Sequence, residues 1–130
     1  MAISDAQRII DEGNTFTYTA TLLNAAGTAI PLSSISTITL TQFVAGTGTI
    51  VNNRDGQNVL NTANVTIHAT SGLLTWLGQP DDSAIVGTGR APGILEQHYA
   101  LFKVTYVVGS DTKYLNHPVE LNIRQLQKIP

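Results

Sequence analysis

The chain has 130 residues, of which 42% are hydrophobic and 12% are charged, and its formal net charge is −2. A chain of this length suits a single domain with its own core. The sequence contains no cysteine, which excludes disulfide bonds and thiolate zinc sites. The basic residues are few and scattered, so we expect no direct nucleic-acid binding.

The first fifteen residues lack the basic and apolar regions of a signal peptide. No segment approaches the roughly 18 consecutive apolar residues that a membrane helix needs. We therefore expect a protein made in a cytosol that does not contact a membrane.

Alternation of apolar and polar residues predicts strands in the first half of the chain. Residues 14–23, NTFTYTATLL, place aromatic and aliphatic side chains on one face and threonines on the other. A turn at residues 24–27 precedes a second alternating run at residues 36–44, STITLTQFV. A short strand, TIV at residues 49–51, then leads into the turn-forming run NNRDGQN at residues 52–58.

The second half continues the pattern. Residues 64–68 and 73–77 are predicted to form two short strands around a turn. Residues 79–93 show no regular alternation of apolar and polar residues. A long loop of this kind is typical of a functional or mobile segment. Residues 94–109 give the longest strand signal, and because its second half is apolar on both faces, we expect a central strand. A hairpin at residues 109–113 returns the chain into a last strand within residues 117–126.

About seven or eight strands at this spacing predict an all-β fold, a single antiparallel immunoglobulin-like β-sandwich. A jelly roll or a small barrel is the alternative, because alternation does not show whether a sheet closes. Only residues 4–11 offer a helical reading. We expect an N-terminal arm or edge segment at residues 1–13, the sandwich at residues 14–127 and a C-terminal tail at residues 128–130.

No residue pattern predicts a cofactor, a metal ion or a catalytic site. His98 and His117 could face each other across the last hairpin, but zinc needs three or four clustered ligands. Aligning Gly56 with the invariant glycine of a calcium loop places Val51 and Thr62 where acidic ligands are needed, so the match fails. The two GTG triplets precede no helix and lack a P-loop lysine. We therefore expect a protein that is not an enzyme.

Two features bear on packing and docking. Trp76, the one tryptophan, is expected between the two sheets of a sandwich. The threonine-rich strand faces are either solubilising surfaces or docking surfaces. A charged fraction about half of the roughly 25% usual in soluble domains favours docking, since it lowers the cost of covering the surface.

The segments FTYTATLLNAAGTAIPLSSISTITLT, GTIVNNRDGQNVLN, VTIHATSGLLTW, QPDDSAIV, EQHYALFKVTY and VELNIRQLQKIP together resemble small virion structural proteins of tailed bacteriophages. The first segment is also similar to immunoglobulin-like modules of phage baseplate and fibre proteins. The resemblance spans nearly the whole chain and lies in the order and residue pattern of these segments. It implies a virion protein made in the bacterial cytoplasm, most simply a capsid decoration or cement protein.

The resemblance implies the major capsid protein or other virion proteins as partners, in a homo-oligomer or multi-copy assembly. Five charged residues in the long loop and the terminal segments are the candidate interface residues: Arg8, Asp81, Asp82, Arg90 and Lys128. The alternatives are a head–tail joining, tail, baseplate or fibre component, or a receptor- or carbohydrate-binding module. The last of these expects exposed aromatics at one loop end, whereas the aromatics here fall mostly within strands.

Overall fold

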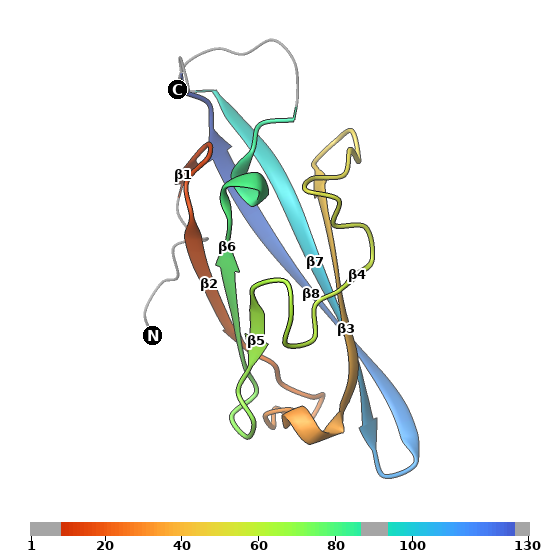
Figure 1. Cartoon of the computed structure of the whole chain (residues 1–130). Helices are drawn as coiled ribbons and strands as arrows, with labels where there is room; N and C mark the ends of the chain where they lie inside the picture. Colours follow the sequence, from red (N-terminus) through yellow and green to blue (C-terminus); the bar gives the residue numbers. More distant parts are fainter. Residues whose placement is uncertain (1–8, 87–93, 127–130) are drawn as a thin grey trace.

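The structure is a computed structural model that describes residues 9–86 and 94–126. The described chain is all-β, with two sheets that face each other as an open sandwich (Figure 1). A sandwich was expected from the strand spacing and is confirmed. The barrel alternative is wrong, because the two sheets remain separate.

The smaller sheet has three antiparallel strands in the order β2-β6-β5. β2 spans Phe16–Thr21, β6 spans Leu73–Gly78 and β5 spans Val65–Ile67. All three were predicted by alternation, and in each strand the inward side chains are apolar.

The larger sheet has five strands in the order β1-β8-β7-β3-β4. They are β1 (Ile9–Asp11), β3 (Ile35–Val44), β4 (Gln57–Asn58), β7 (Leu95–Val108) and β8 (Asp111–Arg124). β1 runs parallel to β8, and the other neighbours are antiparallel. β7 lies between β8 and β3, which confirms the central position expected from its apolar second half.

Three local expectations change. The helical reading of residues 4–11 is wrong for residues 9–11, which form the edge strand β1; residues 4–8 lie outside the described part. The predicted strand at residues 49–51 makes only a single bridge, between Ile50 and Phe43. In the described residues, two short 3-10 helices, η2 (Leu32–Ser34) and η3 (Pro80–Ser83), connect strands. No helix in the described residues has the length and apolar character needed to span a membrane.

Trp76 lies in the centre of the core, as expected, with no exposed surface. Its ring meets Phe16 from its own sheet and Phe102 from β7 in edge-to-face contacts, with centroids 5.0 and 5.5 Å apart. Phe16 packs over Gly78, its register partner in β6, where a Cβ atom would collide with the ring. Three aromatic rings therefore join the two sheets around one point.

The core also takes in polar residues at one end. Alternation in β3 places Gln42 on the same inward face as Leu40, and alternation in β7 places His98 on the inward face with Ala100. Both polar side chains are fully buried. The interior at this end of the sandwich is therefore polar, and each group there needs a partner.

Among the described residues, β1 covers the outer edge of β8 only at Asn122 to Arg124. There the Arg124 carbonyl accepts a hydrogen bond from Glu12 N–H, whereas Gln125 N–H donates to the Ile94 carbonyl on the other side. Backbone groups alternate sides along an antiparallel strand, so Pro118, six residues before Arg124, also directs its nitrogen outward. The proline therefore leaves the ladder with β7 intact and removes a donor from the outer edge of β8.

Candidate interaction surface

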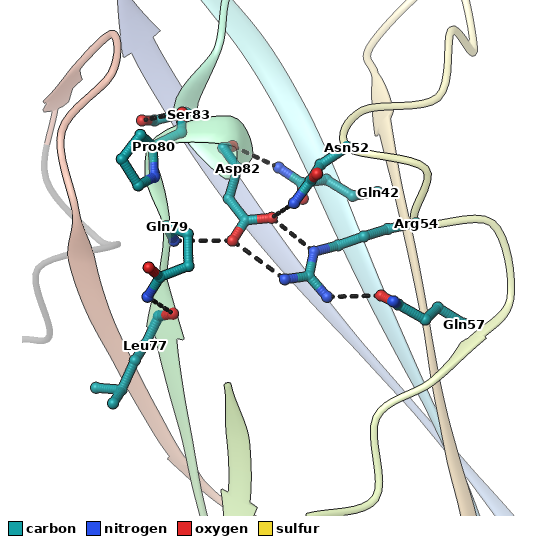
Figure 2. A network of polar contacts seen from close by, with 9 residues as sticks. All are labelled: Gln42, Asn52, Arg54, Gln57, Leu77, Gln79, Pro80, Asp82 and Ser83. Atoms are coloured by element: carbon teal, nitrogen blue, oxygen red, sulfur yellow. Dashed lines mark hydrogen bonds and ion pairs between the residues drawn. The ribbon is translucent and has the colours of Figure 1, made fainter. Parts of the chain in front are cut away.

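Asp82, a predicted interface residue, is fully buried and forms an ion pair with Arg54, which is 3% exposed (Figure 2). Arg54 Nε donates to Asp82 Oδ1 at 2.6 Å and Nη2 donates to Oδ2 at 3.1 Å, so the pair is bidentate. Asn52 Nδ2 and the Gln79 backbone N–H also donate to this carboxylate, at 2.8 and 2.9 Å. A partner could reach Asp82 only if this loop opened.

The ion pair and its neighbouring hydrogen bonds hold two loops, residues 51–58 and η3, against the sheets. Gln42 of β3 donates its side-chain amide to the Asp82 carbonyl at 2.7 Å, and Arg54 Nη1 donates to the Gln57 side chain at 2.8 Å. The Arg54 guanidinium also lies over the Trp76 ring, 5.7 Å from its centroid. Residues 51–58 and η3 are thereby held against the core, which gives this network a structural role.

The other predicted interface residues are placed only in part. Asp81, next to Asp82 in η3, is exposed. Arg8, Arg90 and Lys128 lie outside the described residues. The described part of the chain therefore contains no cluster of the predicted charged residues.

The three histidines occupy separate places. The register pairs His98 with Leu121 and His117 with Phe102, so the expectation that the two histidines face each other is wrong. His98 Nε2 contacts Glu96 Oε1 at 2.7 Å, and His68 Nδ1 accepts from backbone N–H groups of its own turn. Within residues 9–86 and 94–126, no group of three His, Asp or Glu side chains gathers where it could hold a metal ion.

A hydrogen bond of 2.5 Å joins the Tyr18 hydroxyl to His117 Nε2 across the seam between β2 and β8. Burial raises the pKa of Tyr18 and lowers the pKa of His117, so both groups stay neutral near pH 7. Beside this pair lies a shallow hollow of about 260 Å³, lined by Tyr18, Pro118, Val119, Glu120 and Asn122. The hollow lies along β8 between Pro118 and Asn122.

The outer face of the smaller sheet carries no charged side chain. None of the strands β2 (FTYTAT), β5 (VTI) and β6 (LLTWLG) contains a charged residue. Every outward position on these strands is a threonine or a leucine. Leu73 and Leu77 are 38% and 48% exposed. The register sets the outward residues in rows: Thr17 beside Leu77, Thr19 beside Thr75, Thr21 beside Leu73, and Thr66 beside Thr75. We call this set the neutral face.

A second exposed apolar region lies at the tip of the β7–β8 hairpin. β3 pairs with β7 only as far as Tyr106, so the residues beyond are supported by β8 alone and extend past the other strands (Figure 1). Val108 and Tyr114 are 51% and 64% exposed there. A hollow of about 210 Å³ separates the tip from the turn at Asn24 to Ala26.

Sequence reasoning identified the threonine faces but missed the ion pair. The sequence signal for the ion pair was Gln42, a polar residue at an inward position of an otherwise apolar alternation. The comparisons with known proteins add no assignment: no protein family, no curated protein and no solved structure matches the chain.

Proposed function

We propose that the sandwich is of the immunoglobulin type. In that fold, strands B, E and D form one sheet, while G, F and C, extended by C′, form the other. In chain order β2, β3, β4, β5, β6, β7 and β8 take the places of B, C, C′, D, E, F and G. The strand order therefore supports the proposal, with β1 as the first strand moved onto the G edge.

We propose further that the protein is a non-enzymatic structural subunit of a tailed phage virion, a decoration or cement protein that binds the major capsid protein lattice. The neutral face carries this proposal. An exposed sheet face usually bears charged side chains, whereas this one presents threonines and two exposed leucines. Covering such a face desolvates no charge, which suits a permanent contact between protein surfaces.

A cement protein acts by the number of its contacts. Each copy buries a modest area, and many copies on one lattice add their weak contacts into a stable shell. The rigid aromatic core at Trp76 and the fastened loops around Arg54 suit this task, because a rigid subunit loses little entropy on docking.

The test compares particles assembled with and without this protein. We expect mass spectrometry to detect it in many copies in purified particles, and electron microscopy to place it on the outer surface of the head. Particles that lack it should release their DNA at a lower temperature. Its absence from purified particles would refute the proposal, and a position at the tail or the head–tail joint would replace the cement role with a tail or connector role.

A further inference from the structure

Three buried polar atoms have no hydrogen-bond partner within the part of the chain that the structure describes: Gln42 Oε1, Trp76 Nε1 and His98 Nδ1. All three residues have no exposed surface. Native interiors leave few such atoms, because a buried polar group without a partner costs stability. The three residues come from β3, β6 and β7, so a group that satisfies all three atoms must lie between the two sheets.

The strand register places the three residues around Ala100. Gln42 is the register partner of Ala100, and His98 is the next inward residue along β7. Diagonal neighbours of this kind in paired strands lie within reach of each other when the side chains are long. Trp76 packs against Phe102, the next inward residue on the other side of Ala100. Ala100 itself contributes only a methyl group, so it fills the least of the interior at this point.

The ion-pair network brings Trp76 and Gln42 together by a second route. The Asp82 carbonyl accepts from the Gln42 amide, and the Asp82 carboxylate accepts from Arg54. The Arg54 guanidinium in turn lies 5.7 Å from the centroid of the Trp76 ring. Contacts within the smaller sheet, the larger sheet and the loops therefore converge on the same part of the core.

The hydrogen bonds already made decide which of the three atoms donate and which accept. Gln42 Nε2 donates to the Asp82 carbonyl at 2.7 Å, so the other amide atom, Oε1, is an acceptor. His98 Nε2 donates to the Glu96 carboxylate at 2.7 Å, so Nδ1 of a ring with one hydrogen is also an acceptor. Trp76 Nε1–H can only donate. One donor and two acceptors remain.

From this set we infer that one water molecule is bound in the core between Gln42, Trp76 and His98. A water molecule donates two hydrogen bonds and accepts others, so it complements one donor and two acceptors. A metal cation does not fit, because the indole N–H would direct its hydrogen at the ion. Buried waters make about three hydrogen bonds each and occur about once per 27 residues, so a chain of 130 residues ordinarily holds several.

The bound water connects hydrogen bonds that are otherwise separate. On one side it extends the contact between Glu96 and His98 at the start of β7, and on the other it reaches Gln42 and the ion pair. Through Trp76 it also joins the smaller sheet to the larger one. The polar end of the core is then a single network in which each member has a partner.

The purified wild-type chain tests the site directly. A crystal structure at high resolution should show one water within about 3.2 Å of all three atoms. In solution, nuclear Overhauser spectroscopy should give a cross-peak between the Trp76 indole N–H and a long-lived water. Electron density without a water at this position, or an indole N–H without the cross-peak, overturns the inference.

Two variants of the same shape test what the water contributes. Ala100→Thr and Ala100→Val both fill the position beside the water, but only the threonine hydroxyl can take over hydrogen bonds to the site. Ala100→Thr should therefore unfold at a higher urea concentration than Ala100→Val. A higher urea midpoint for Ala100→Val overturns the inference, because it is the order expected in a dry core.

Val104→Thr is the matched control. Val104 is also inward on β7 and is fully buried in the apolar core, where a hydroxyl finds no water to bind. This variant should unfold at a lower urea concentration than the wild type, and an unchanged midpoint overturns the contrast between the two positions. These outcomes concern the core alone and are independent of the proposed function, which is decided by the presence of the protein in particles.

Discussion

The buried ion pair gives the sharpest prediction on stability. Arg54→Met keeps most of the side-chain volume of Arg54 and removes its charge and donors, which leaves the Asp82 carboxylate buried with only Asn52 and Gln79 to donate to it. Asp82→Asn performs the converse change and leaves a guanidinium buried beside a neutral amide. Both variants keep the surrounding shape, so the change is electrostatic.

The magnitude follows from burial. Removing one partner of a buried ion pair costs about 3–5 kcal/mol, because the remaining charge loses its counter-charge away from water. Each single variant should therefore lose about 3–5 kcal/mol of the roughly 5–15 kcal/mol that such domains have. The double variant leaves no unpaired charge, and its loss should fall below the sum of the two single losses by at least about 2 kcal/mol.

Urea denaturation followed by the fluorescence of Trp76, the one tryptophan, measures all three variants. Arg124→Met is the control, since Arg124 Nε also lies 2.6 Å from a carboxylate, that of Asp11, but both side chains are partly exposed to water. Solvent screens this pair, so its loss should be far smaller. Additive losses in the double variant, or a loss from Arg124→Met as large as that from Arg54→Met, would refute the reasoning.

Three further predictions concern the core and the seam. Gly78→Ala drives a methyl group into the Phe16 ring and should cost about 1–3 kcal/mol in urea denaturation; an unchanged midpoint would contradict this packing. Trp76→Phe should cost about 1–3 kcal/mol, less than truncation to alanine, because part of the buried ring remains; thermal unfolding by circular dichroism measures it. Burial lowers the pKa of His117 from 6.5, so the unfolded chain takes up its proton at a higher pH than the folded protein, and the free energy of unfolding should fall as the pH drops below about 6.5. His117→Gln should make the free energy of unfolding depend less steeply on pH between pH 5 and 7 than it does in the wild type. An equal pH dependence in both proteins would show that His117 does not contribute to it.

The strands were predictable because alternation records which side chains face the core. Phe16 and Tyr18 in β2, and Phe102 and Val104 in β7, lie inward as their period predicts. Trp76 follows the same rule. The order of strands in the sheets was not available from local pattern, since β1 pairs with β8 across more than a hundred residues.

The ion pair escaped prediction for a physical reason. Asp82 follows Pro80 in an aperiodic segment, where a carboxylate is ordinarily solvated, and its partner Arg54 lies 28 residues earlier in a turn-forming run. Only the three-dimensional arrangement brings the two loops to the same end of the sandwich. Gln42 and His98 occupy inward positions and make this end polar, but their positions alone do not show which charges meet there.

The parallel pairing of β1 with β8 has a mechanical consequence. The two strands run in the same direction, so a pulling force that enters at the start of β1 and leaves at the end of β8 slides one strand along the other. The hydrogen bonds between them, including that from Glu12 N–H to the Arg124 carbonyl, then share the load simultaneously and cannot be opened one after another. The domain therefore resists stretching along this line more strongly than it resists peeling of the β7–β8 hairpin from its tip.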